Sequence, residues 1–372
     1  MTKGSSNTEV RIFNQKRIVN MLFHDGPMTI KDLAARLELS LPTISVILKN
    51  LAAKGLVVRG EKQRNSEGRP PSQIMLAFDA KVSVGISISS RHVRLALVDL
   101  GPNVIDKEKH ALAFEGSDKY WNQVRDLLSG FIAKNNLESQ RLLGVGLSVQ
   151  VPIEDGEPKP ASMASMSKEK WDFSKPRAAI PNLIFIRSDA KMASLAQIWG
   201  VGEDEDVVFL ILANSVGGAI VSNRHIFHLE SKNAEFGHMV LHDGGRECYC
   251  GKRGCLDAYC SVHKLLEQAG VELEYFFTEL SEGNEKFARI WDSYLYDLAL
   301  GIHNLRMAFD TDIILGGEMS TYLANYMDEL KRRLAERNPF KEGGSYLRLA
   351  GYGEYDSAIG AAMLHIDQFL SQ

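Results

Sequence analysis

The 372-residue sequence has no long apolar run and only four cysteines, and both scarcities exclude classes of protein. No apolar stretch reaches the roughly 18 residues that a membrane span requires. The polar start MTKGSSNTEV lacks the apolar segment of a signal peptide. We therefore expect a cytoplasmic protein without a membrane partner. Hydrophobic residues make up 45% and charged residues 24% of the chain, which is typical of a globular protein of two or three domains.

The four cysteines all lie between positions 248 and 260. A secreted protein held by disulfides spreads its cysteines along the chain, whereas a cluster in a cytosolic protein indicates metal binding. The spacing His238-x9-Cys248-x-Cys250-x4-Cys255 offers three thiolates and one imidazole, a set that closes a tetrahedral Zn²⁺ site of the structural type. Cys260 is expected to be buried outside this site. We predict a structural zinc ion bound by His238, Cys248, Cys250 and Cys255.

The net charge of −4 conceals an asymmetry between the two ends of the chain. Residues 1–80 hold 12 Lys and Arg against 7 Asp and Glu, a balance of +5, and the remaining residues hold 31 against 40, a balance of −9. A basic head on an acidic body indicates that the head binds an anion, nucleic acid first of all, although chance unevenness would give the same numbers.

Residues 11–54 show three helical patterns in a row. The first covers 11–23, the second 30–37 and the third 41–54, with Thr29 and Ser40 in N-cap positions before the second and third. Two short helices joined by a tight turn are typical of a helix-turn-helix, in which the third helix of the set reads DNA. The alternative is a three-helix bundle that binds protein. Polar and small residues on the exposed face of the third helix favour contact with base edges and phosphates.

The segment after these helices resembles a wing. Residues 56–59 and 73–76 read as two strands, and the turn-rich segment between them contains Gly68-Arg69-Pro70, which suits an A·T-rich minor groove. A wing after the third helix favours the DNA-binding interpretation over a three-helix bundle that binds protein. The predicted DNA-contacting residues are Thr29, Pro42, Thr43, Ser45, Val46, Lys49, Arg59, Arg64 and Arg69.

From residue 82 onward, strands alternate with helices. Strand patterns occupy 82–88, 93–98, 143–149, 207–212, 217–221 and 313–317, and helical patterns occupy 121–132 and 357–370. Two α/β halves whose glycine-containing turns face a cleft are the expected arrangement.

The run Glu235-Phe236-Gly237-His238, the Cys-x-Cys-Gly-x2-Gly-Cys segment and Leu256-Asp257 resemble the signature of the ROK family of repressors and sugar kinases. With the winged head, the chain resembles the repressor branch of that family, of the NagC/Mlc/XylR type. The resemblance implies an α/β fold in which a winged helix-turn-helix precedes a two-lobed, actin-like ATPase (ribonuclease H-like) body. The implied domains are 1–77, a first lobe of 78–200 closed by 356–372, and a second lobe of 201–355 with the zinc loop 235–260.

The resemblance also separates this chain from the kinases of the family. Their first strand ends in an Asp-x-Gly-Gly-Thr loop that binds ATP phosphates and metal, whereas this chain has Ser87-Ile88-Ser89-Ser90-Arg91. Without the acidic residue and both glycines, phosphate approach is obstructed and Mg²⁺ is poorly held. The second phosphate loop is altered to Asn214-Ser215-Val216-Gly217-Gly218, although its paired glycines are kept. We therefore predict that the protein is not an enzyme.

The residues that bind the sugar in this family match this chain better than the ATP-binding residues do. Asp189 matches the base that accepts a proton from a sugar hydroxyl, and Glu235 and His238 match sugar-contacting positions. Ser188 stands where the family has Asn, and Asp257 where it has Glu. The resemblance implies a ligand site of Ser188, Asp189, Glu235, His238 and Asp257, although Asp189 as a solvated loop acid and Glu235 as a support for the zinc loop are alternatives. Candidate partners for a phosphorylated ligand are Arg91, Arg187 and Lys191.

These observations predict a repressor that binds operator DNA as a homodimer or homotetramer and responds to a sugar or sugar phosphate. The alternatives are an active sugar kinase with an added DNA-binding domain, a regulator controlled by a protein partner, and activation in place of repression.

Overall fold

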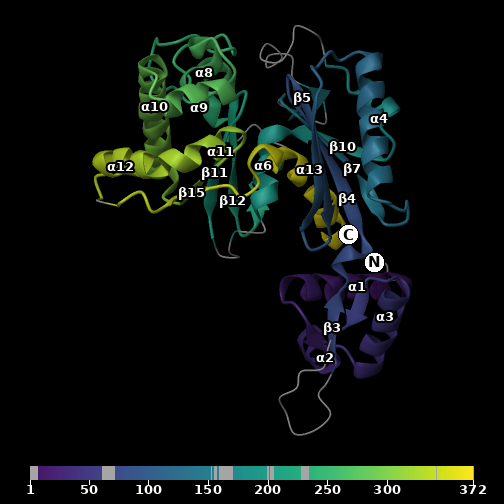
Figure 1. The fold of residues 1–372 in the computed structure, drawn as a ribbon. Helices are drawn as coiled ribbons and strands as arrows, with labels where there is room; N and C mark the ends of the chain where they lie inside the picture. The colour runs from purple at the N-terminus through teal and green to yellow at the C-terminus, as the bar shows by residue number, and fades with distance from the viewer. Residues whose placement is uncertain are drawn as a thin grey trace, which may run out of the picture.

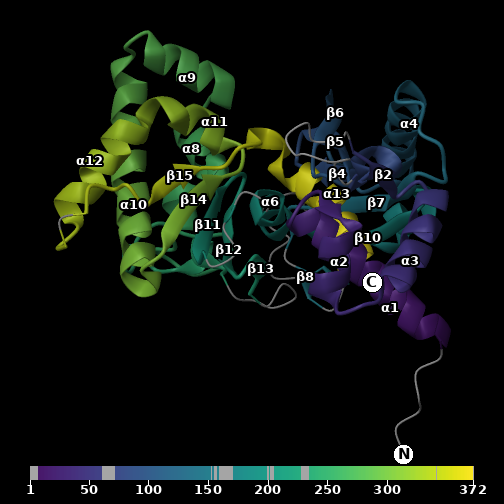
Figure 2. The same ribbon diagram turned by 90° about the horizontal axis from the view of Figure 1, so that it is seen from below.

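The computed structural model describes residues 7–60, 72–151, 153–154, 157–158, 171–198, 201, 205–227, 234–340 and 342–371. They form a small head and two α/β lobes (Figure 1). The head lies beneath the first lobe in Figure 1, and it therefore lies in front of that lobe in Figure 2, which is seen from below. Among the described helices, none combines the length and the apolar character needed to cross a membrane.

The head combines three helices with a small antiparallel sheet. Its elements are α1 (Asn7–His24), β1 (Met28–Thr29), α2 (Ile30–Leu37), α3 (Leu41–Ala53), β2 (Val57–Arg59) and β3 (Gln73–Leu76), and the strand order is β1-β3-β2. Asp32 N–H donates to the Thr29 hydroxyl over 3.2 Å, and the Asp32 carboxylate accepts the Thr29 N–H, so a capping box starts α2. Ser40 caps α3 by accepting the Thr43 N–H. These caps fix where the two short helices begin.

The first lobe is a five-stranded sheet in the order β10-β7-β4-β5-β6. Its strands are β4 (Val82–Ile88), β5 (His92–Asp99), β6 (Val104–Ala111), β7 (Leu142–Val149) and β10 (Leu183–Ser188). The strands β4, β5 and β6 form an antiparallel meander, and β7 and β10 add parallel to β4. Helix α4 (Asp118–Lys134) covers one face, together with α5 (Ser174–Ala179), and α13 (Asp356–Ser371) covers the other (Figure 1). A short hairpin, β8 (Ile153–Glu154) with β9 (Glu157–Pro158), lies between β7 and α5 in the sequence, and the 3-10 turn η1 (Phe78–Ala80) precedes β4.

The second lobe repeats this topology. Its order, β13-β12-β11-β14-β15, again starts with an antiparallel meander and continues with two parallel strands. The strands are β11 (Val207–Leu212), β12 (Val216–Ser222), β13 (His225–Ile226), β14 (Asp312–Gly316) and β15 (Leu347–Leu349). The helices are α7 (Asp257–Cys260), α8 (Val262–Ala269), α9 (Leu273–Ser281), α10 (Glu285–Phe309), α11 (Met319–Leu323) and α12 (Met327–Arg337). Short 3-10 turns are η4 (Phe236–His238), η5 (Ala324–Tyr326) and η6 (Gly353–Tyr355).

Helix α13 joins the three parts. It packs on β4, on β7 and on α6 (Asp189–Gln197) so closely that a Cβ at Gly85 would lie 1.8 Å from Ala358 O, and one at Gly360 would lie 1.7 Å from Met192 O. At its start the Asp356 carboxylate accepts the Gly317 N–H after β14, over 3.1 Å. At its end Leu370 O accepts the Asn20 side-chain amide of α1 over 3.0 Å. The helix therefore contacts the head, the first lobe and the turn that follows β14 of the second lobe.

Candidate functional site

The exposed face of α3 is the DNA-reading surface that the sequence predicts. Pro42, Thr43, Ser45, Val46 and Lys49 are exposed, and Val46 keeps 59% of its surface accessible. The opposite face is buried in the head core and contains Ile44, Ile47, Leu48 and Leu51. Packing of the buried apolar face thus holds these five side chains toward solvent.

The remaining residues predicted to contact DNA differ in position. Arg59 is exposed at the end of β2, where the wing begins. Thr29 is half-buried, and its hydroxyl donates to the Asp32 carboxylate over 2.7 Å, so this group serves the capping box. Arg64 and Arg69 lie outside the described residues. DNA contact by each of these residues stays a prediction.

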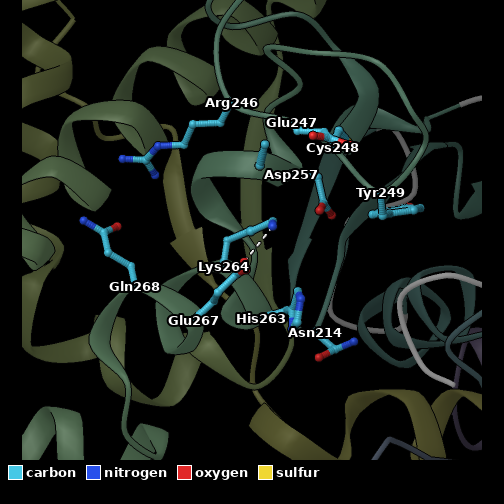
Figure 3. Close-up of a pocket in the computed structure, with 11 residues that line it drawn as sticks. Asn214, Arg246, Glu247, Cys248, Tyr249, Asp257, His263, Lys264, Glu267 and Gln268 are labelled. Atoms are coloured by element: carbon cyan, nitrogen blue, oxygen red, sulfur yellow. Dashed lines mark hydrogen bonds and ion pairs between the residues drawn. The ribbon is translucent and has the colours of Figure 1, made fainter.

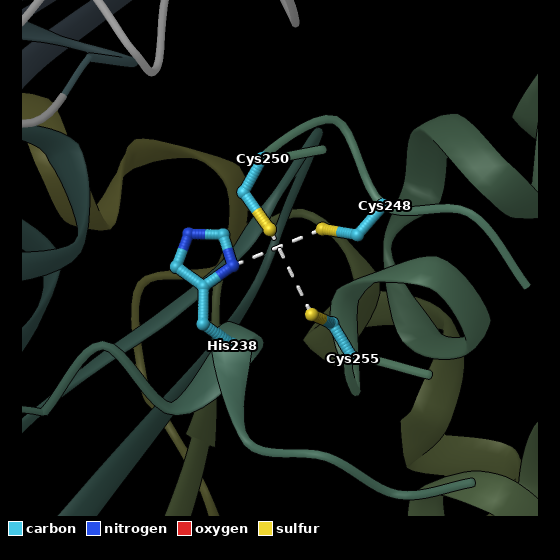
Figure 4. A group of neighbouring side chains, drawn as sticks. All are labelled: His238, Cys248, Cys250 and Cys255. Atoms are coloured by element: carbon cyan, nitrogen blue, oxygen red, sulfur yellow. Dashed lines mark hydrogen bonds between the residues drawn. The ribbon is translucent and has the colours of Figure 1, made fainter. Parts of the chain in front are cut away.

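The second-lobe segment between β13 and α7 gathers one histidine and three cysteines (Figure 4). The ligand atoms of His238, Cys248, Cys250 and Cys255 all lie within 4.8 Å of one another. Cys250 Sγ lies 3.8 Å from Cys255 Sγ, and Cys248 Sγ lies 3.8 Å from His238 Nδ1. With Zn–S bonds of about 2.3 Å and tetrahedral angles, two ligating sulfurs stand about 3.8 Å apart. The donor set and its spacing therefore fit a tetrahedral metal ion of the zinc type.

Two glycines allow the cysteine loop to fold around one point. Gly251 and Gly254 have φ values of 80° and 85°, which L side chains rarely adopt. A Cβ on Gly254 would also lie 1.9 Å from His242 O. The loop closes through Cys248 N–H, which donates to Lys252 O over 2.8 Å. Cys260 is fully buried in α7 and does not belong to the group, as expected.

A small polar cavity lies beside this cluster, with a volume of about 30 Å³. It is lined by Gln150, Val151, Ser188, Asp189, Ala190, Ile211, Ser215, Val216, Gly217, Glu235 and Tyr249. Asp189 is the first residue of α6, directly after β10, and its Oδ1 accepts the Ala190 N–H over 2.8 Å. Burial of the carboxyl, together with the neighbouring Glu235 charge, raises the pKa of Asp189 to about 7. Asp189 is therefore poised to be either a donor or an acceptor at neutral pH.

Of the five predicted ligand residues, the structure brings Ser188, Asp189 and Glu235 to this cavity. Asp257 is buried, and its carboxylate accepts the Val216 N–H over 2.6 Å. The ring of His238 turns Nδ1 to the cysteines and Nε2 to the Tyr249 hydroxyl, 3.2 Å away. Sequence reasoning missed Tyr249. Its position between two metal-ligating cysteines was the available signal.

Two larger cavities adjoin this region. The lobe-2 cavity, of about 580 Å³, is lined by Asn214, Arg246, Glu247, Cys248, Tyr249, Asp257, Ala258, His263, Lys264, Glu267 and Gln268 (Figure 3). The inter-lobe cavity, of about 620 Å³, lies between residues 89–92 of the first lobe and residues 262–273 of the second. Arg91 and Glu272 form an ion pair across it. The two lobes are thus connected by opposite charges at the mouth of this cleft.

The three cations predicted to meet a phosphorylated ligand lie in different places. Arg91 lines the inter-lobe cavity, whereas the Arg187 guanidinium lies 5.8 Å from the Phe185 ring centroid and donates to Ile186 O. Lys191 is buried on α6; burial raises the pKa of Glu235, and the nearby Lys191 charge opposes this rise. A single phosphate contacted by all three is not favoured by this arrangement.

Comparison with known proteins places these features in a family. The model of the ROK family matches residues 83–368, and a model of a winged helix-turn-helix DNA-binding domain matches residues 14–58. The xylose repressor of Bacillus subtilis (strain 168) is 23% identical over 383 residues, which cover 98% of both chains.

Solved structures agree with this match. A ROK family transcriptional regulator described as a homologue of the E. coli MLC protein superimposes with a TM-score of 0.74 at 18% identity, covering 97% of this chain and 96% of that one. The ROK hexokinase of Thermus thermophilus superimposes with a TM-score of 0.62 at 21% identity, covering 78% of this chain and all of that one (100%). The predicted fold, a winged head before a two-lobed α/β body, is confirmed. The chain belongs to the ROK family.

Proposed function

We propose that the protein is a sequence-specific DNA-binding transcriptional repressor, and that a sugar or sugar phosphate in its body controls its affinity for DNA. The observation that carries this proposal is the place of α13: the Asn20–Leu370 hydrogen bond ties it to the DNA-binding head, and Asp356 ties it to the turn after β14. A change in the angle between the lobes therefore has a direct route to α1. The similarity to a xylose repressor supports the same function.

The head would bind DNA in the usual manner of its fold. Helix α3 enters the major groove, with Thr43, Ser45 and Val46 near base edges and Lys49 near a phosphate. A homodimer or homotetramer would place two heads on half-sites about 34–36 Å apart. A cytoplasmic location is part of the proposal, because the operator is there.

The body is proposed to be a sensor without kinase activity. The segment in the position of the first phosphate loop is a closed hairpin turn, in which Ser89 N–H donates to His92 O over 2.9 Å. Beneath it, buried Arg94 donates to the Glu354 carboxylate over 2.9 Å and lies 3.6 Å from Glu318. Two carboxylates already compensate this guanidinium, and Arg91 pairs with Glu272. These ion pairs, together with the lack of a metal-binding Asp in the loop, support the proposal that the loop does not bind ATP phosphates.

The proposed effector contacts are hydrogen bonds from sugar hydroxyls to Asp189 and Glu235. When bound, a zinc ion would supply a fixed crosslink between the cysteine loop and His238. The residues of this chain then position the ligand: α6 presents Asp189, and the segment before η4 presents Glu235. We propose that the sugar binds more tightly to the angle between the lobes at which the head binds DNA weakly. DNA affinity then falls by the ratio of the sugar's affinities for the two lobe arrangements.

Selection from random DNA duplexes tests this proposal. The full chain is expected to enrich a two-fold symmetric sequence and to bind it with a Kd on the order of 10⁻⁸ M or below. Incubation with hexoses and ATP-Mg²⁺ is expected to give no sugar phosphate. Enrichment of no sequence would contradict the DNA-binding part, and steady turnover would contradict the sensor part.

The raised pKa of Asp189 predicts that sugar binding depends on pH. A sugar hydroxyl donates to the ionised carboxylate, and with a pKa of about 7 the ionised fraction rises from about a tenth at pH 6 to about nine tenths at pH 8. Affinity is therefore expected to rise about tenfold between pH 6 and 8, with release of a proton on binding. Titration calorimetry in two buffers measures both effects.

The matched variant for this prediction is Asp189→Asn, which is expected to bind more weakly and to lose the part of the pH dependence that comes from this carboxyl. Because the folded-state pKa lies above the ordinary value of 3.8, the wild type loses stability as pH rises from about 4 through 7. The variant lacks this loss, so its melting temperature relative to the wild type rises with pH. A pH-independent sugar affinity in the wild type would show that Asp189 does not accept the hydroxyl.

A further inference from the structure

The side chain of Tyr249 occupies the boundary between two cavities. It lines the 30 Å³ polar cavity together with Asp189 and Glu235, and it also lines the 580 Å³ lobe-2 cavity. In Figure 3 it lies beyond Asp257 at one edge of the larger cavity. A cavity of about 30 Å³ has room for about two water molecules, whereas small-molecule sites usually measure 300–1,000 Å³. In this conformation the polar cavity is too small for a sugar.

The Tyr249 hydroxyl also has the contact that a ligand hydroxyl would need. His238 directs Nδ1 toward the cysteines, so a metal ion bound there leaves the ring proton on Nε2. Nε2–H then donates to the Tyr249 oxygen, 3.2 Å away, and the two rings meet edge to face at 5.2 Å. A sugar hydroxyl oxygen would accept the same hydrogen bond. The Tyr249 hydroxyl therefore occupies the position at His238 Nε2 that a ligand hydroxyl would take.

The backbone around Tyr249 restricts how it can leave. Its neighbours on both sides, Cys248 and Cys250, belong to the metal-ligand group. Cys248 is further held by its N–H bond to Lys252 O and by Gly251 N–H, which donates to Cys248 O over 2.9 Å. With the backbone fixed, the side-chain torsions remain as the main freedom. Tyr249 is half-buried, and the lobe-2 cavity beside it offers space for the ring.

We propose that Tyr249 is the gate and the size-selecting residue of the effector site. In the ligand-free protein its ring fills the sugar position and its hydroxyl accepts the hydrogen bond of His238. A pyranose or furanose sugar enters when the ring rotates toward the lobe-2 cavity, and a ligand hydroxyl then replaces the tyrosine hydroxyl at Nε2. This inference rests on the proposed function, because it requires the sugar to bind beside Asp189 and Glu235.

A gate of this kind lowers the apparent affinity by the fraction of protein in the open state. If the closed state holds about 90–99% of the molecules, removing the ring raises sugar affinity about 10- to 100-fold. Tyr249→Phe removes the hydrogen bond and keeps the ring, so it should raise affinity about 2- to 10-fold. Tyr249→Ala also removes the size limit. Its gain should therefore be larger for N-acetyl-D-glucosamine than for D-xylose.

Titration calorimetry of the full-length chain tests the proposal, with D-xylose, D-glucose and N-acetyl-D-glucosamine as probes. The proteins are the wild type, Tyr249→Phe, Tyr249→Ala and the control Tyr275→Ala, whose side chain is exposed on α9. Metal content is measured for each. The expected order of affinity is Tyr249→Ala, then Tyr249→Phe, then the wild type, with the control equal to the wild type and the selectivity for small sugars lost in Tyr249→Ala.

Each other outcome has a defined meaning. If a sugar binds the wild type, and both Tyr249 variants with normal metal content bind it equally or more weakly, the gate is wrong and the sugar-effector proposal stands. If metal-loaded wild type and both variants bind no sugar, the sugar-effector proposal fails and the gate fails with it. Tyr249→Phe decides the matter if Tyr249→Ala does not fold, because it preserves the ring packing.

Discussion

Replacing Cys248 or Cys255 with serine is expected to remove the bound metal and to lower the melting temperature by about 10 °C or more. Both sulfurs are buried, and each lies 3.8 Å from another ligand atom of the group. Structural zinc contributes on the order of 10 kcal/mol to small zinc domains, and a loss of a few kcal/mol shifts the melting temperature of a domain this size by roughly 10 °C. Serine is a poor zinc ligand, so the loop between His238 and α7 loses its crosslink.

The matched control is Cys260→Ala. Cys260 lies in the same segment and is fully buried, but it is outside the metal group. It should keep one equivalent of metal and lose only the stability expected for a small cavity, about 1 kcal/mol. Metal content by mass spectrometry and melting by circular dichroism give both values. Full metal content in Cys248→Ser, or loss of metal in Cys260→Ala, would show that the assignment of the site is wrong.

Substituting glutamate for Val46 is expected to weaken DNA binding at least about 100-fold without destabilising the protein. Val46 is 59% exposed at the centre of the α3 face that should enter the major groove. A carboxylate there meets phosphates and loses an apolar contact, which together cost a few kcal/mol. Because the side chain has little packing to lose, the melting temperature should stay within about 2 °C of the wild type.

The control for this variant is Ile105→Glu. Ile105 is a β-branched residue with 48% exposure on β6 of the first lobe, outside the head and outside the exposed face of α3. Fluorescence anisotropy with the selected duplex should find unchanged affinity for the control. Equal loss in both variants would indicate a general effect of negative charge. Retained affinity in Val46→Glu would place the reading face elsewhere on the head.

Local signals in the sequence were sufficient for much of the head and of the lobe cores. The pattern predicted a helix over 30–37 and a strand over 207–212, and the structure has α2 and β11 with the same bounds. N-caps and apolar periodicity act within a few residues, so they can be read directly. Within the first helical pattern, over 11–23, Ile18 and Leu22 are buried, whereas Ile12 is 45% exposed. Apolar periodicity identifies which face of a helix is apolar. It does not show which turns of that helix are covered by the rest of the protein.

The candidate site could be predicted only in part, because sequence patterns report on residues that are close together in the chain. Spacing identified the four candidate metal ligands because they lie within 18 residues of one another, and their geometry could hold a metal ion. The contact of Arg91 with Glu272 joins residues from different lobes, and no local pattern indicates it. Tyr249 was overlooked because a motif marks its ligands and leaves the intervening side chains unspecified. Asp257 was assigned to the ligand from its match to the family; its carboxylate accepts the Val216 N–H and it lines the lobe-2 cavity, so its contact with a ligand stays a prediction.

The central claim is that a ligand in the body changes DNA affinity through α13. The most direct measurement is the Kd of the full-length chain for its selected duplex, in the absence and presence of a saturating sugar that raises its melting temperature. With sugar bound, DNA binding is expected to be about 5- to 150-fold weaker, which is the usual range of coupling between two sites. Asn20→Leu, which removes the hydrogen bond to Leu370, is also expected to reduce this loss of DNA affinity while sugar binding persists. An equal Kd with and without bound sugar would contradict the account.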